Sequence, residues 1–268
     1  MMIDVQGRPD ERGVPLDEAG ISDLSYPIVV LDRSQEKQHT IGKLSMSVGL
    51  PHHFKGTHMS RFLEVLEDFK GEMTMRTLPE MLRRVRTRLD AETARIEVSF
   101  PYFLERLAPV TKSRGLIDYQ CTFIGTSNGE SEDFILSVRV PVTSLCPCSK
   151  EISDYGAHNQ RGYLTLDVRT TGHVSDPAHW VWIEELVEIA EASASCPVYP
   201  LLKRADERFV TMKAYENPVF VEDMVRNVAV KLRDDARIAW FRVHARNDES
   251  IHHHNAFAST TWRRPASP

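Results

Sequence analysis

The chain has 268 residues, 41% of them hydrophobic and 26% charged, and its formal net charge of -5 at pH 7 argues against electrostatic binding to nucleic acid as its main activity. Its length fits one large domain or two fused modules of roughly 100–150 residues each. No apolar stretch approaches the roughly 18 residues of a membrane span, and the polar N-terminus lacks the apolar centre of a secretory signal, so we expect a cytoplasmic protein that does not bind membranes.

The first half of the chain alternates between strand and helix patterns. Residues 1–25 mix proline, glycine and acidic residues without a period, so we expect a flexible N-terminal segment. Beyond it, apolar residues recur at every second position in some stretches and with helical spacing in others. The predicted elements are strands over 27–31 and 42–50, helices over 60–69 and 77–89, and strands over 96–100 and 117–125.

The second half repeats this order of elements without repeating the sequence. The predicted elements are strands over 134–142 and 164–168, helices over 183–190 and 217–232, and strands over 237–245 and 251–262. Asn217 and Pro218 are typical of the cap and the first position of a helix. Hairpin-connected strands with helices inserted in pairs predict an α+β fold with antiparallel sheets and helices on one face. We therefore expect two fused ββααββ modules over 26–130 and 131–268, the second carrying most candidate site residues.

The most unusual stretch is SLCPCSKEISDYGAHNQRGY, which places Cys146, Cys148 and His158 in one loop between two predicted strands. Four cysteines in a chain of this length are too sparse for a disulfide scaffold. Thiolates and imidazoles are good ligands for a zinc-class ion, but Pro147 limits how far the two thiols can converge on one ion. One cysteine as ligand and the other as a free thiol is therefore favoured. The alternative is a pair of buried cysteines with a solvent-facing histidine.

A second unusual stretch, DESIHHHNAF, contains three consecutive histidines. If this stretch is extended, His252 and His254 point to one face and His253 to the other, with Glu249 nearby. Two imidazoles and a carboxylate suit general acid–base chemistry near neutral pH. The alternative is a solvated histidine cluster that binds metal adventitiously.

Two acidic residues and a scattered set of basic residues complete the candidates. Glu222 lies early in the predicted helix over 217–232, where a carboxylate can accept two N–H donors from the amide–amine edge of a purine. A first-turn acid that interacts with the helix dipole is the alternative. Glu207 is ordinary when taken by itself. A polyphosphate could be held by Lys150, Arg161, Lys203 and Arg204; the alternative is that these are ordinary surface cations.

Four segments resemble the signature segments of prokaryotic type IB GTP cyclohydrolase I. They are PVTSLCPCSKEISDYGAHNQRGY, YPLLKRADERFVTMKAYENPVFVEDMVRNVA, ESIHHHNAFA and KGTHMSRF, and the likeness spans roughly residues 26–262. The resemblance implies a tunnelling fold with two modules in each subunit, and a homotetramer with active sites at subunit interfaces. It also implies conversion of GTP and water to formate and 7,8-dihydroneopterin 3′-triphosphate, the entry to tetrahydrofolate and 7-deazaguanine synthesis.

The resemblance further assigns roles to individual residues. It makes Cys146, His158 and Glu207 the ligands of a divalent metal ion, with Zn²⁺, Mn²⁺ and Fe²⁺ all left open. Cys148 is then the thiol facing the substrate, and Glu222 is the carboxylate that anchors the guanine. The acid–base group is Glu249, His252 and His254, and whether His252 also reaches the metal stays open. The triphosphate is then assigned to the basic set Lys150, Arg161, Lys203 and Arg204.

Two other functions compete with this one. A related tunnelling-fold enzyme reduces a nitrile with NADPH through a cysteine thioimide, which would make Cys148 a covalent nucleophile. A non-catalytic protein could instead use Cys146, His158 and Glu207 to hold a structural zinc ion. The nitrile reductase has no obvious use for the histidine cluster or for a metal.

Overall fold

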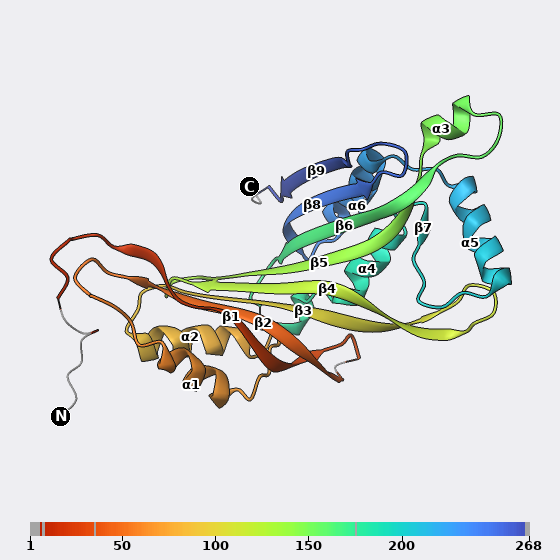
Figure 1. Cartoon of the computed structure of the whole chain (residues 1–268). Helices are drawn as coiled ribbons and strands as arrows, with labels where there is room; N and C mark the ends of the chain where they lie inside the picture. The colour runs from red at the N-terminus through yellow and green to blue at the C-terminus, as the bar shows by residue number, and fades with distance from the viewer. Residues whose placement is uncertain (1–5, 7–8, 35, 175, 266–268) are drawn as a thin grey trace. The chain divides into compact units, whose positions relative to one another are not determined.

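Figure 1 shows a computed structural model of the chain, which describes residues 6, 9–34, 36–174 and 176–265. The strands are β1 (Leu16–Leu31), β2 (Lys37–Leu50), β3 (Ala94–Leu107), β4 (Arg114–Ser127), β5 (Glu132–Leu145), β6 (Asn159–Thr170), β7 (Cys196–Pro197), β8 (Ile238–Asp248) and β9 (Ala256–Arg263). The helices are α1 (Ser60–Asp68), α2 (Leu78–Leu89), α3 (Pro147–Ile152), α4 (Ile183–Glu191), α5 (Arg204–Glu216) and α6 (Val221–Asp234), with a 3₁₀ turn at Pro177–His179.

The strands that the structure describes follow the order β1-β2-β3-β4-β5-β6-β8-β9, and the short β7 pairs with β5. The pairings of β1 with β2, β5 with β6 and β8 with β9 are antiparallel, as hairpin-connected neighbours require. The prediction of an α+β fold with antiparallel pairing is confirmed. None of the helices that the structure describes is long and apolar enough to cross a membrane.

Residue contacts divide the chain into two compact units. The first comprises the described residues up to 100 together with 122–135 and 172–180, and the second comprises 101–121, 136–171 and the described residues from 181 onward. The strands β3, β4 and β5 each contribute residues to both units. The predicted module boundary near residue 131 stays a prediction.

The first unit packs two helices against the strands near the N-terminus (Figure 1). Helix α1 contacts α2, and α2 contacts β2. Alternate residues of β2, such as Leu44 and Met46, are fully buried, and so are Phe62 on α1 and Val85 on α2. The two-residue and helical periods that predicted these elements therefore mark the faces that meet in this core.

The N-terminal segment is shorter than predicted. Residues 16–25, which we expected to be flexible, form the first part of β1 and pair with β2. Register shifts between Leu16 and Ala19 and between Ile21 and Leu24 break the regular alternation of a strand, so the sequence carries no two-residue period there. Residues 1–5 and 7–8 of the predicted flexible segment lie outside the described residues.

The second unit covers one face of its strands with α4 and α6. Helix α4 contacts β6, and α6 contacts β8 and β9. The helices carry fully buried residues such as Val187 and Val228, and the strands carry fully buried residues such as Val140 and Val243. The strands β5, β6 and β8 that carry several candidate site residues therefore contribute to this core.

Two predictions in this unit are wrong. Helix α5 was not predicted, because its apolar residues do not gather on one face: Phe209 and Met212 are exposed, whereas Ala214 and the polar Asp206 are buried. Asn217 is not the cap of α6, which begins later, at Val221. Asn217 instead ends α5, and its Nδ2 donates to the carbonyl oxygens of Ala194 and Ser195 at 3.0 and 3.2 Å.

Candidate active site

A pocket of about 270 Å³ in the second unit gathers six of the predicted site residues from four separate segments. These residues are Cys146, His158, Glu222, Glu249, His252 and His254. The lining also includes Ser144, Gln160 and Asn247, none of which was predicted. Ser144 and Gln160 flank the Cys–His loop in the sequence, but nothing in the sequence around Asn247 marks it as a site residue.

The Cys–His loop is closed at its base by backbone bonding. Strand β5 ends at Leu145, and the Cys146 N–H donates to the His158 carbonyl oxygen at 3.1 Å just before β6 begins. Cys146 also caps the short helix α3, since its Sγ accepts from the Ser149 N–H at 3.5 Å, and Pro147 occupies the first helical position. The loop therefore brings a half-buried thiol and a half-buried imidazole to the same pocket.

The imidazole of His158 is oriented by a side-chain amide. Its Nδ1 lies 2.8 Å from Oε1 of the buried Gln160, and the Ser250 hydroxyl lies 3.5 Å from the same nitrogen. A carbonyl oxygen accepts from a ring N–H, so this contact favours the tautomer with the proton on Nδ1 and the lone pair on Nε2. This arrangement is typical of histidines that bind metal ions through Nε2.

The opposite side of the pocket is the first turn of α6. Phe220 precedes the helix without forming a side-chain cap, and Glu222 lies in the first turn with its side chain exposed. A carboxylate there is stabilised by the helix dipole and can still accept hydrogen bonds from a ligand.

The histidine cluster lies in a bend rather than a strand. Strand β9 begins only at Ala256, so the strand predicted over 251–262 starts later than expected. The rings of His252 and His254 nevertheless stack, with centroids 5.2 Å apart and planes 14° from parallel. Both rings line the pocket together with Glu249, while His253 is not among the lining residues.

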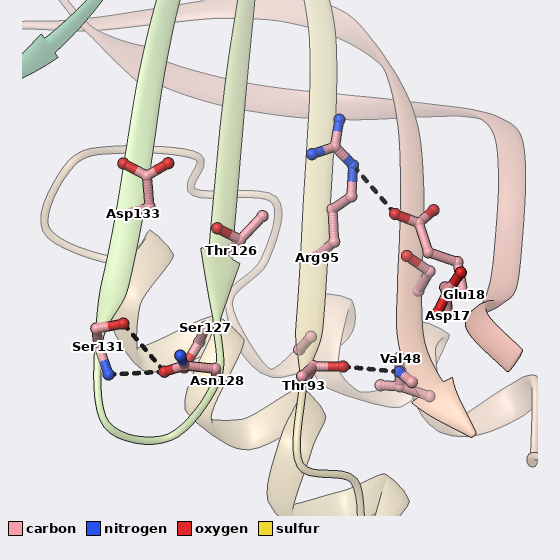
Figure 2. Close-up of a pocket in the computed structure, with 13 residues that line it drawn as sticks. Asp17, Glu18, Val48, Thr93, Arg95, Thr126, Ser127, Asn128, Ser131 and Asp133 are labelled. Atoms are coloured by element: carbon pink, nitrogen blue, oxygen red, sulfur yellow. Dashed lines mark hydrogen bonds and ion pairs between the residues drawn. The ribbon is translucent and has the colours of Figure 1, made fainter. Parts of the chain in front are cut away.

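A second pocket, of about 250 Å³, lies in the first unit (Figure 2). Several of its polar groups contact one another: Arg95 pairs with Glu18, and the Ser131 N–H and hydroxyl donate to the Asn128 side chain at 2.8 and 3.0 Å. The described residues that line it include no cysteine or histidine. It offers no thiol or imidazole, so the pocket of the second unit is the candidate active site.

A family model described as type I GTP cyclohydrolase FolE2 matches residues 2–258. The chain belongs to this family. The GTP cyclohydrolase FolE2 of Nitrosococcus oceani is 51% identical over 255 residues, covering 95% of this chain and 93% of the relative. The GTP cyclohydrolase FolE2 of Geobacter sulfurreducens is 51% identical over 258 residues, covering 96% and 97%. The resemblance inferred from the four segments is confirmed.

Solved structures show the same fold at low identity. Uricase from Arthrobacter globiformis matches with a TM-score of 0.54 and 10% identity, over 94% of each chain. Urate oxidase from Bacillus subtilis matches with a TM-score of 0.54 and 10% identity, over 92% of this chain and 98% of the other. These likenesses confirm the tunnelling fold and carry no functional argument.

The remaining residues predicted from the FolE2 resemblance do not line this pocket. Cys148 is exposed on α3, and Arg161 is exposed on β6. Lys150 points to α5, where its Nζ donates to the Tyr215 carbonyl oxygen at 2.6 Å. The first turn of α5 and its cap hold Lys203, Arg204 and Glu207, all exposed.

The predicted metal ligands are not assembled within one chain. Among the residues that the structure describes, no three histidine, cysteine, aspartate or glutamate side chains are grouped so that they could hold a metal ion. The Lys150 contact attaches the end of α5 near Tyr215 to the Cys–His loop. Glu207 lies eight residues earlier, about 12 Å along the helix axis, and it does not line the pocket that holds Cys146 and His158.

The buried carboxylate of Asp206 fixes the start of α5. It accepts hydrogen bonds from the backbone N–H groups of Val110, Thr111 and Lys203 at 2.8–2.9 Å, and from the Thr111 hydroxyl at 2.6 Å. Burial alone would raise the pKa of Asp206, but these four hydrogen bonds outweigh it and hold the pKa well below its usual range. The anchored carboxylate thereby positions the α5 residues that the family resemblance assigns to metal and phosphate.

Proposed function

We propose that this chain hydrolyses GTP to formate and 7,8-dihydroneopterin 3′-triphosphate, the first step of tetrahydrofolate and 7-deazaguanine synthesis. The observation that carries the proposal is the pocket that gathers a thiol, three imidazoles and two carboxylates in a member of the type I GTP cyclohydrolase family. This set matches the needs of the reaction, which are base recognition, water activation and several proton transfers.

Two of the three proposed metal ligands fit a divalent ion by their chemistry. Cys146 supplies a thiol, and His158 supplies an Nε2 lone pair held in place by the Gln160 contact. We propose Glu207 as the third ligand on the family resemblance, and a site shared between subunits would allow a neighbouring copy to supply it. When bound, Zn²⁺, Mn²⁺ or Fe²⁺ would acidify a water molecule and so provide the nucleophile for hydrolysis at neutral pH.

The chain's own residues bind the base and move protons. The Glu222 carboxylate would accept from the N1–H and the 2-amino group of guanine and so place C8 for attack by water. A first water opens the five-membered ring at C8, and a second releases C8 as formate. Rearrangement of the ribose and ring closure then expel one water, so the net reaction consumes one.

The proton transfers of this sequence are assigned to Glu249, His252 and His254. The ring nitrogens and the ribose hydroxyls must gain and lose protons at several steps, and the stacked imidazoles lie on the pocket wall beside the carboxylate. Cys148 stays the proposed thiol facing the substrate, although it does not line the pocket in a single chain. The nitrile reductase needs this thiol as its covalent nucleophile, and it has no obvious use for the histidines that line the pocket.

The triphosphate is assigned to four basic residues outside the pocket lining. Charge-assisted hydrogen bonds from cations are the usual way to hold a polyphosphate. Reversal of the charge at any one of them should raise the KM for GTP, and an unchanged KM would remove that residue from the set. The four residues are Lys150, Arg161, Lys203 and Arg204.

A homotetramer in the cytoplasm completes the proposal. Active sites between subunits would place residues from α5 of one copy beside the pocket of another, and light scattering would measure the number of subunits. The four cysteines are free thiols, the state that a reducing compartment maintains.

Product analysis tests the proposed reaction. Purified protein incubated with GTP should release formate and the fluorescent pterin in a ratio of one to one. Oxidation of NADPH with a 7-cyano-7-deazaguanine substrate, without formate release from GTP, would instead identify the nitrile reductase.

A further inference from the structure

We propose that Ser144 and Asn247 are positioning residues that hold Glu222 for recognition of the guanine base. This inference rests on the proposed function, in which Glu222 anchors the substrate. Ser144 on β5 and Asn247 on β8 are 1% and 2% exposed, and both lie on the pocket wall. They are 103 residues apart in the chain and meet only because β5 and β8 both flank β6.

A short chain of hydrogen bonds links these two residues to the segment that precedes α6. The Asn247 Nδ2 donates to the Ser144 Oγ at 2.9 Å, and the Ser144 hydroxyl donates in turn to the Val219 carbonyl oxygen at 3.1 Å. The Val219 N–H donates to the Leu145 carbonyl oxygen at 3.1 Å. Both backbone polar groups of Val219 are therefore held by the end of β5.

Glu222 lies three residues after Val219, about one helical turn further along the chain. Phe220 lies before the helix without a side-chain cap of its own, so the Val219 bonds fix the direction in which α6 begins. A shift of the Val219 carbonyl would move the first turn of α6 and displace the Glu222 carboxylate from the pocket wall.

The amide at position 247 sets the direction of the hydrogen-bond chain. A serine hydroxyl has one proton, and the Asn247 amide donates to Ser144, so that proton remains available for the Val219 carbonyl oxygen. An acceptor at position 247 would compete for the same proton.

Within the described residues, the other end of this amide adds no further hydrogen bond to the chain. The Asn247 Oδ1 is buried and accepts no hydrogen bond from the residues that the structure describes. A Cβ at Gly162, on the facing strand, would lie 2.8 Å from this oxygen, so glycine leaves the room that the amide occupies. A buried acceptor without a donor is unfavourable. We infer that the amide is placed here for the hydrogen bond that its Nδ2 donates to the Ser144 Oγ.

The substrate edge that Glu222 would read has two donors, N1–H and the 2-amino group. A carboxylate held in place can accept from both, whereas a displaced one loses at least one bond. Inosine triphosphate lacks the 2-amino group, so its binding depends less on where the carboxylate lies. Loss of the hydrogen bond from Ser144 to Val219 should therefore weaken GTP binding and reduce the preference for GTP over inosine triphosphate. The chemical steps should change little.

The test compares four variants of the full-length protein by calorimetric binding of both nucleotides and by steady-state turnover. Ser144→Ala should raise the Kd and the KM for GTP about tenfold, the effect of losing roughly one hydrogen bond from a buried network. The preference for GTP should fall by a similar factor, while kcat changes far less. Ser144→Thr keeps the hydroxyl and should restore both values. Asn247→Leu removes the donor to the Ser144 Oγ but leaves the Ser144 hydroxyl able to donate to the Val219 carbonyl oxygen, so its effect should be smaller.

Thr143→Val is the matched control. Thr143 precedes Ser144 on β5, and its hydroxyl donates to the Cys196 carbonyl oxygen at 3.0 Å rather than to Val219. This variant should bind both nucleotides as the wild type does. An equal effect of Thr143→Val and Ser144→Ala would show general disturbance of the strand and overturn the proposal.

Amide hydrogen exchange of residues 219–223, measured in the absence of substrate, reports whether the hydrogen-bond chain holds this segment. The amides of this segment should exchange faster in Ser144→Ala than in the wild type. Identical exchange rates, or an identical affinity for GTP, would overturn the positioning role. A wild-type protein that binds GTP but releases no formate would refute the proposed reaction alone. Wild-type protein that does not bind GTP would refute both.

Discussion

The backbone N–H of Cys146 donates to the carbonyl oxygen of His158 across 3.1 Å, so the two residues close the base of one loop. Both side chains line the same pocket. The proposed pair of metal ligands is therefore held by the pairing of β5 with β6, independently of the metal itself.

Removal of the Gln160 side-chain oxygen should weaken metal binding. Gln160→Leu deletes the acceptor 2.8 Å from Nδ1 of His158, so the ring loses the contact that orients it and favours a free lone pair on Nε2. The affinity for an activating ion should fall about 10–100-fold, and turnover should recover at saturating metal. Mn²⁺ activation curves of the two proteins measure this, and superimposable curves would show that Gln160 does not orient a ligand.

Replacement of the proposed base anchor should act on substrate binding. Glu222→Gln leaves one acceptor oxygen in place of the carboxylate, so the KM for GTP should rise about 10–100-fold, the effect of losing one charge-assisted hydrogen bond. Asp223→Asn is the control, because Asp223 neighbours Glu222 but pairs with Arg226 at 2.8 Å and does not line the pocket. Its KM should stay at the wild-type value, and equal effects of the two changes would argue against specific recognition by Glu222.

The stacked histidines should control the rate of the chemical steps. His252→Gln and His254→Gln should each lower kcat by about 10²–10⁴-fold, the usual contribution of a general acid or base. His253→Gln provides the internal control, since this residue lies between the other two and is not among the lining residues. Steady-state formate release measures all three, and full activity in both pocket variants would exclude them from proton transfer.

Asp206 should stabilise the fold in a pH-dependent manner. Its pKa in the folded protein lies below the unfolded value of about 3.9, so its contribution is present above pH 4 and is lost as the pH falls below it. Asp206→Asn should lower the melting temperature at pH 7, and the gap to the wild type should narrow toward pH 3. Scanning calorimetry at both pH values checks this, and an unchanged melting temperature at pH 7 would contradict the anchoring role.

Elements with an uninterrupted period could be predicted from the sequence. Strand β2 alternates from Leu44 to Leu50 and helix α6 carries a continuous apolar stripe, so both were predicted close to where they lie. The first part of β1 was missed because its bulges break the alternation. Helix α5 was missed because Phe209 and Met212 are exposed and its start is held by the buried polar Asp206.

Site residues that lie close together in the sequence could be predicted from it. Cys146 and His158 share one loop, and His252 and His254 share one side even though their segment is a bend. Ser144 and Asn247 escaped prediction because their bond joins strands that only the folded sheet brings together.

The most direct test of the proposed function is release of formate and pterin fluorescence from GTP by chelator-treated protein, with and without added Mn²⁺ or Zn²⁺, alongside a Cys146→Ala variant. The proposal predicts metal-dependent formate with a dihydroneopterin product, lost in the variant at an unchanged melting temperature. A folded, metal-loaded tetramer that releases no formate from GTP would contradict it.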